Sequence, residues 1–183
     1  MALSKRWQLS AFEYHVDFIT VPALFALAIW LGPISIWQIV AGALLWSLME
    51  YGIHRFLFHK YFRRDHWAHH VNPSEYIGIS GLQVALAYLV ALLPAYWLGL
   101  TSLYAGVLIG YMAYITIHYV MHRPQSWLYR CIGMLIKNHD MHHQKGIEKN
   151  FGVTSPLWDW IFFSYAAPSS ASAGKNPADD KQK

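Results

Sequence analysis

The sequence predicts an all-α protein that is embedded in a membrane as a four-helix bundle. Its 183 residues are 55% hydrophobic and only 13% charged, about half the charged share of a typical soluble domain. Two long stretches, residues 18–49 and 76–122, contain no Asp, Glu, Lys or Arg. Ten of the 11 histidines gather at the edges of these stretches, so we expect the apolar helices to end at a shared polar site.

The first charge-free stretch predicts two helices, over residues 18–31 and 34–58, because Gly32 and Pro33 mark a turn between them. A helix needs about 20 apolar residues to cross the hydrocarbon core of a bilayer. The stretch is short for two complete spans. We therefore interpret the pair as a short span followed by a longer one, with a partly inserted hairpin as the alternative.

The second charge-free stretch is long enough for two spans, with a turn near residues 99–101. Residues 126–137 then carry apolar side chains at three- and four-residue steps, which predicts an amphipathic helix on the membrane surface or over the histidine site. The last residues are rich in Ala, Ser and Pro and favour a disordered tail. The expected organisation is an N-terminal cytoplasmic segment 1–17, a membrane-embedded domain 18–165 and the tail 166–183.

The basic residues predict the orientation in the membrane. Every Lys and Arg lies before residue 7, between residues 55 and 64, or from residue 123 onward. Because basic residues favour the cytoplasmic side, we expect both termini and all the histidine groups there, in a multi-pass protein of an inner membrane or the endoplasmic reticulum. The net charge of +4 is then a signal of topology, and no nucleic-acid partner is expected. The single cysteine, Cys131, excludes an internal disulfide.

The clustered histidines predict a metal centre, because imidazole is the commonest nitrogen ligand for iron, zinc and copper. Ten rings are too many for one ion, so we expect two ions with about four or five nitrogen ligands each. The fold is thus a bundle with a cytoplasmic, histidine-rich dimetal cap. The ten expected ligands are His54, His59, His66, His69, His70, His118, His122, His139, His142 and His143.

The spacing of these histidines is that of helix faces. His118 and His122 are four residues apart, and each triplet reads His-x-x-His-His, so one helix can direct two rings at one ion. Adjacent rings on a helix diverge, which favours splitting each doublet between the two ions. His54 and His59 are five apart, so we expect them to bind different ions or the helix to end between them. His15 has no partner and is interpreted as an interfacial residue.

These motifs resemble the fatty acid hydroxylase/sterol desaturase superfamily, and most closely its fatty acid 2-hydroxylase branch. The resemblance implies a four-helix membrane oxygenase with a histidine-coordinated dimetal centre, which hydroxylates a lipid C–H bond with O₂ as co-substrate. It covers residues 50 to 163 and rests on EYGIHRFLFH at 50–59, HWAHH at 66–70, HYVMH at 118–122, HDMHH at 139–143 and NFGVTSPLWD at 150–159.

The chain also departs from that family. The connector between His59 and His66 is short, which puts the substrate contacts in doubt. The haem-binding electron-carrier domain often fused to such enzymes is not expected here, so the resemblance implies a separate electron-donor protein. Two iron ions are the expected cofactors. Zinc is a possible substitute, because imidazole discriminates weakly between these metals.

Four further residues are candidates for orienting the ligands, because a carboxylate or phenol can accept the free ring N–H of a histidine. They are Glu50, Tyr114, Asp140 and Asp159. The sequence leaves other functions open on the same histidine centre, namely a lipid desaturase and a carotenoid or sterol hydroxylase. Outside the enzymes, it leaves a histidine-rich metal transporter and a bis-histidine haem electron carrier. A zinc protease of the His-Glu-x-x-His type is excluded, because that motif is absent.

Overall fold

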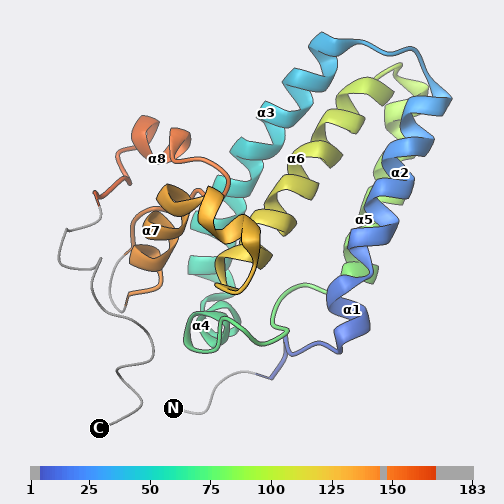
Figure 1. The fold of residues 1–183 in the computed structure, drawn as a ribbon. Coiled ribbons are helices and arrows are strands. Elements are labelled where there is room, and N and C mark those ends of the chain that lie inside the picture. Colours follow the sequence, from blue (N-terminus) through green and yellow to red (C-terminus); the bar gives the residue numbers. More distant parts are fainter. Residues whose placement is uncertain (1–4, 145–147, 168–183) are drawn as a thin grey trace, which may run out of the picture.

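A computed structural model describes residues 5–144 and 148–167, and the regular secondary structure in these ranges is helical (Figure 1). The prediction of an all-α protein is confirmed. The predicted tail falls almost wholly outside the described residues. The elements in order are α1 (Ala11–His15), α2 (Asp17–Leu31), α3 (Ile36–Gly52), the π-helix η1 (Ile53–Tyr61), α4 (Arg63–Val71), α5 (Gly81–Trp97), α6 (Thr101–Met121), the 3-10 helix η2 (Trp127–Cys131), α7 (Gly133–His142) and α8 (Leu157–Ile161).

Helix α6 lies at the centre of the apolar bundle, packed along α3 on one side and along α2 and α5 on the other (Figure 1). Its contact with α3 is a backbone-to-backbone contact through two glycines. A Cβ on Gly42 would lie 2.0 Å from the carbonyl oxygen of Leu103, and a Cβ on Gly106 would lie 2.1 Å from that of Ile39. Small residues at such positions let membrane helices approach closely.

Three helical stretches are long and apolar enough to cross a membrane, namely Ala11–Leu31, Ile36–Tyr61 and Thr101–Met121. The fourth expected span, α5, is apolar but has 17 residues. The two turns fall where the sequence predicts them, and Gly99 in the second turn has a φ of 68°. The first helix begins earlier than expected, at Ala11, because Ser10 and Glu13 form a capping box there.

The surface of the bundle is apolar, as a lipid environment requires. Within the three spanning stretches only 22–39% of the most apolar window is buried. Trp30, Trp37 and Trp97 lie beside the two turns and are largely exposed, which is typical of an aromatic belt at a membrane interface. The chain is therefore a membrane protein, and only a minority of the residues in its spanning helices are buried in the interior of the bundle.

The short helices α4, α7 and α8 gather at the opposite end of the bundle from the turns (Figure 1). The predicted single helix over residues 126–137 is wrong: η2 ends at Cys131 and α7 begins at Gly133, because Ile132 between them leaves the helical conformation. Ile136 of α7 packs on Met121 and Val153. Ile132, Leu135 and Ile136 of the stripe therefore pack inward, whereas Trp127 and Cys131 are exposed.

The N-terminal segment closes over the same end. The N–H of Leu9 donates to the Tyr76 carbonyl at 2.8 Å, and the N–H of Gly78 donates to the Trp7 carbonyl at 3.0 Å. The Trp7 ring packs edge-on against Phe58 at 5.1 Å between centroids. This strap joins the start of the chain to the loop between α4 and α5, a contact that the sequence did not predict.

Candidate metal centre

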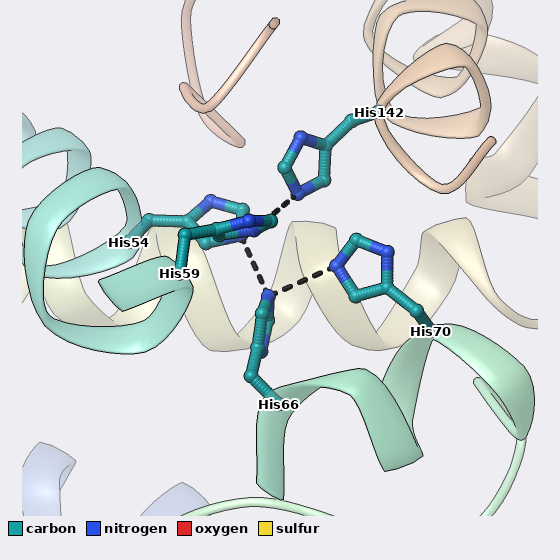
Figure 2. Close-up of side chains that lie close together, drawn as sticks. All are labelled: His54, His59, His66, His70 and His142. Carbon is teal, nitrogen blue, oxygen red and sulfur yellow. Dashed lines mark hydrogen bonds between the residues drawn. The ribbon is translucent and has the colours of Figure 1, made fainter. Parts of the chain in front are cut away.

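Nine of the ten predicted ligands fall into two compact groups of imidazoles. In each group, one ring nitrogen per histidine lies within 4.8 Å of the corresponding nitrogens of the others. The first histidine group contains His54, His59, His66, His70 and His142 (Figure 2). The second histidine group contains His69, His122, His139 and His143.

The first group depends on an unusual helix. His54 and His59 both lie on the π-helix η1, whose five-residue hydrogen-bond repeat brings side chains five apart onto one face. Figure 2 shows both rings projecting from this element toward the same centre. The expectation that they serve different ions, or that the helix ends between them, is therefore corrected. The helix continues with a wider turn, and both rings join one group.

The two doublets divide as the helical geometry predicts. His70 lies in the first group and its neighbour His69 in the second, while His142 lies in the first group and His143 in the second. Helices α4 and α7 each stand between the groups, because adjacent side chains on a helix point about 100° apart. The two groups are thus built from shared helices and lie side by side.

The spacing of the nitrogens fits ligation of an ion. Nε2 of His66 is 3.0 Å from Nε2 of both His54 and His70, and Nε2 of His59 is 3.1 Å from Nε2 of His142. Two ligands on one ion at about 2.1 Å lie about 3.0–3.4 Å apart in octahedral or tetrahedral geometry. These three pairs of nitrogens in the first group therefore stand at separations that two ligands of one ion require.

In the second group, both the spacing of two nitrogens and the lack of hydrogen-bond partners for two others fit the binding of an ion. Nε2 of His139 is 3.1 Å from Nε2 of His122. The Nε2 atoms of His69 and His143 are buried and have no hydrogen-bond partner in the described part of the chain. Buried polar atoms are almost always paired, so these orphans are explained if they ligate an ion. The tenth histidine, His118, lies outside the group but close to it, with its Nε2 3.4 Å from that of His122.

Burial keeps the imidazoles neutral, which is the form that binds metals. Desolvation is the main cause, and neighbouring histidines add to it. These effects lower the pKa of His70 and His142 to about 3 and that of His122, beside Arg123, to about 4. The pKa values of His66, His69, His139 and His143 are also lowered, for the same reason.

Backbone carbonyls orient two rings of the first group. Nδ1 of His54 donates to the Phe151 carbonyl at 2.6 Å, and Nδ1 of His142 donates to the Lys149 carbonyl at 2.8 Å. Because a neutral imidazole carries one proton, each bond leaves a lone pair on Nε2, directed into the group. Residues 149–154, the closing segment, therefore fix both the tautomer and the direction of these ligands.

The carboxylates Glu50 and Asp159 hold the closing segment and do not touch a ring nitrogen. Glu50 accepts hydrogen bonds from the backbone N–H of Val153 and Thr154 at 2.7 and 2.9 Å. Asp159 accepts from the N–H of Phe151 and Gly152 at 2.9 and 2.7 Å. The expectation that they bind a histidine directly is corrected: a carbonyl takes that place, and the carboxylates position the carbonyl.

The other two candidate residues differ from each other. Tyr114 stacks on the ring of His118, with centroids 5.5 Å apart and planes at 19°. Asp140 is exposed on α7 and makes no hydrogen bond to a histidine within the described residues. His15 stays apart from both groups, and its Nδ1 hydrogen-bonds to the Ala11 carbonyl at 2.7 Å.

Asn150 is a residue whose role the sequence did not reveal. It is 1% exposed and adopts a φ of 57°, a left-handed conformation that asparagine tolerates better than most residues. Its side chain accepts from the N–H of Ala166 at 2.8 Å and donates to the carbonyl of Ala166 at 2.9 Å. It therefore ties the closing segment to the last described turn. The only signal was its place in the family-like run at 150–159.

A cavity of about 510 Å³ leads from the histidines into the bundle. Its wall is mostly apolar, and it reaches His54, His66, His69 and His118. It lies between α3 and α5, whose backbones stay apart while the rings of Trp46 and Tyr88 lie 6.5 Å apart between centroids. A space of this size and character suits a long apolar ligand.

A second, smaller hollow of about 50 Å³ also reaches the first group. Its floor includes His59, His70 and His142, and its rim includes Arg63 and Glu148, which form an exposed ion pair at 3.5 Å. The first group can thus be approached both from the apolar cavity and from a polar surface.

Comparison with known proteins gives one consistent family. A profile of the family described as fatty acid hydroxylase matches residues 39–164. The chain is 35% identical over 151 residues to the ceramide very long chain fatty acid hydroxylase SCS7 of Saccharomyces cerevisiae. The aligned residues make up 70% of this chain and 38% of that protein. It is 33% identical over 144 residues to the human fatty acid 2-hydroxylase, and this alignment covers 66% of this chain and 37% of that protein.

Two further relatives extend this result. The chain is 31% identical over 141 residues to the dihydroceramide fatty acyl 2-hydroxylase FAH2 of Arabidopsis thaliana, with 66% of this chain and 57% of that protein covered. A solved structure described as full length scs7p, in which only the hydroxylase domain is visible, matches with a TM-score of 0.60 and 26% identity, over 90% of this chain and 69% of that one. This chain therefore spans less than two thirds of the length of several of its relatives.

Proposed function

This chain belongs to the fatty acid hydroxylase family, and we propose that it is a membrane-bound dimetal oxygenase that hydroxylates the acyl chain of a fatty acid or lipid. The observation that carries the proposal is the meeting of two imidazole groups with an apolar cavity inside a membrane bundle. In the reaction, one oxygen atom of O₂ enters a C–H bond and the other leaves as water, with two external electrons and two protons.

We propose iron as the metal of both groups, one ion in each, with zinc able to occupy the same ligands. When bound, the ions supply the activation of O₂ and the attack on the C–H bond. His54, His66 and His70 then hold one ion together with His59 and His142, while the second group holds the other. The closing segment keeps the His54 and His142 rings in the correct tautomer.

The cavity holds the acyl chain and excludes water from the reacting carbon. His54, His66, His69 and His118 line its inner end, so a chain lying in it brings one carbon to the histidines. We propose that a lipid enters sideways from the bilayer between α3 and α5, whose backbones do not come into close contact. Substrate then need not pass through water.

The proposed topology has four spans, with α5 as the shortest, and the histidine end in the cytoplasm. The support is the distribution of the basic residues, which avoid both turns. Residues 18–165 form the proposed membrane domain, after the segment 1–17 and before the tail 166–183. Electrons are proposed to come from a separate donor protein on the cytoplasmic side.

The test is expression in a host of defined lipid composition, with a competent reductase, followed by mass spectrometry of the lipids. We expect lipids that have gained one oxygen atom. Loss of two hydrogens without oxygen would instead identify a desaturase, and an oxidised carotenoid or sterol would identify the corresponding hydroxylase. His142→Ala is expected to abolish the product, because it removes a donor from the first group.

His15→Ala is the matched control, because His15 lies outside both groups. It is expected to keep the product at the level of the unaltered protein. Absence of any new lipid, together with equal behaviour of the two variants, would overturn the proposed function.

A further inference from the structure

An acidic residue lies in the wall of the apolar cavity, away from the histidines. Asp17 stands at the start of α2, is 5% exposed and lines the cavity together with Tyr111 of α6. Asp17 lies at the cytoplasmic end of the proposed first span, and burying a carboxyl group is costly unless its oxygens are paired. The position of Asp17 therefore calls for a partner of its own.

Within the described part of the chain, Asp17 is only half satisfied. The Tyr111 hydroxyl donates to its Oδ2 at 2.5 Å, whereas its buried Oδ1 accepts no bond from another side chain, although the backbone N–H groups of Asp17 and Phe18 lie against the carboxylate. The other acid in this wall, Glu50, is different: both of its oxygens accept bonds from Val153 or Thr154. Glu50 thus serves the protein itself, whereas Asp17 has an acceptor left over.

A donor without a partner lies on the other side of the same tyrosine. Trp46 lines the cavity and packs edge-on against the Tyr111 ring, with centroids 5.1 Å apart and planes at 90°. Its buried indole Nε1 also has no hydrogen-bond partner among the described residues. Buried indole N–H groups usually find a partner, so the wall carries one unmet acceptor and one unmet donor around Tyr111.

This polar spot lies at a defined distance from the histidines. Tyr111 precedes His118 by seven residues on the continuous helix α6, which is two turns or about 10 Å along the helix axis. A chain with one carbon at the histidines would pass the polar spot at about that distance along the cavity. The spot can therefore contact the substrate without taking part in the oxidation.

We infer that Asp17 and Trp46 form a subsite for a neutral lipid group that both donates and accepts hydrogen bonds, which is a hydroxyl or a secondary amide. The group would donate to Asp17 Oδ1 and accept from Trp46 Nε1, which requires both buried side chains to turn toward the cavity. This inference rests on the proposed function for its substrate class. It makes the enzyme selective for a polar lipid over a plain hydrocarbon chain.

The test measures binding without turnover, on the full chain in detergent, without reductant. Three radiolabelled lipids of equal length are compared: a plain alkyl ester, the same chain with a hydroxyl placed at successive carbons, and the corresponding secondary amide. We expect at least one polar lipid to bind about tenfold more tightly than the plain one, as one or two additional hydrogen bonds allow. The favoured lipid identifies whether a hydroxyl or an amide is the ligand.

Trp46→Phe and Asp17→Asn are the test variants, and Glu75→Gln, an exposed acid outside the cavity, is the matched control. Trp46→Phe keeps an aromatic ring against Tyr111 and removes only the N–H, so it should preserve the fold. Both test variants are expected to bind the plain lipid normally and to lose the preference for the polar one. Glu75→Gln is expected to keep it.

Equal binding of all three lipids by the unaltered protein would overturn the inference. An equal weakening of the binding of all three lipids in both variants would also overturn it. That result would mean that Asp17 and Trp46 only stabilise the packing of the helices. Because binding is read without turnover, these outcomes are distinct from a failure of the hydroxylase proposal, which is decided by the lipid products.

Discussion

The two histidine groups differ in how firmly the protein holds them. In the first group, two rings donate to backbone carbonyls of the closing segment, which Glu50 and Asp159 brace in turn. In the second group, His69, His139 and His143 each have a buried ring nitrogen without a partner in the described residues, whereas in the first group only His70 does. The comparison teaches that the protein itself orients part of the first group, whereas in the described residues no backbone carbonyl orients a ring of the second group.

The largest expected effect comes from removing a ligand of the braced group. His66→Ala deletes the ring whose Nε2 lies 3.0 Å from two other ligands, so we expect activity to fall more than about 100-fold, beyond the range typical of residues that only orient ligands. Elemental analysis should show one ion per chain in place of two. His122→Ala should do the same for the second group. Full metal content in either variant would contradict the division into two sites.

The hydrogen bonds from the closing segment to Asp159 can be removed without changing a ligand. In Asp159→Asn, an amide NH₂ replaces an oxygen that accepts from Phe151 or Gly152, so the closing segment loses its position. We expect metal affinity at the first group to fall about 10–100-fold, with the second group unchanged. Chelator competition measures both, and Glu75→Gln serves as the control. An equal loss at both groups would show that the brace acts on the whole fold.

Stepwise metal loading should rank the two groups. Because the first group is already oriented, it is expected to fill first, with an affinity about tenfold above that of the second, the lower end of the effect of outer partners. Metal titration of the metal-free protein should show two steps, and His66→Ala should remove the tighter one. Loss of the tighter step in His122→Ala would reverse the assignment.

The smallest expected effect lies in the cavity, away from both groups. Ala91 lines the cavity on α5, and Ala91→Phe adds bulk to its wall. Metal content should stay unchanged, while the hydroxylated products shift toward shorter chains, as measured by lipid mass spectrometry. An unchanged product profile would mean that the acyl chain does not reach Ala91.

Much of the candidate site could be predicted because its residues carry strong local signals. The His-x-x-His-His triplets indicate helix faces, and the division of His69 from His70 and of His142 from His143 follows from the angle between adjacent residues. The pairing of His54 with His59 could not be predicted, since a π-helix has no clear sequence signature. Neither could the roles of Glu50 and Asp159, because their partners are backbone groups about 100 residues away or in a loop.

Asp17 shows the same limit for a single residue. In the sequence it is one acid before an apolar stretch, with nothing to distinguish it from a solvated terminus. Only the packing of α2 against α6 brings it to Tyr111 and to the wall of the cavity. The break at Ile132 is similar, because the apolar steps of residues 126–137 continue through it.

The sequence by itself determined the membrane class, the helical repeat of the ligands and the family, because composition and periodicity are properties of neighbouring residues. The tertiary structure decided which rings share a group, which carbonyls orient them and which tyrosine binds the buried acid Asp17. These depend on contacts between segments far apart in the chain, such as Glu50 with Val153, and local chemistry does not specify such contacts.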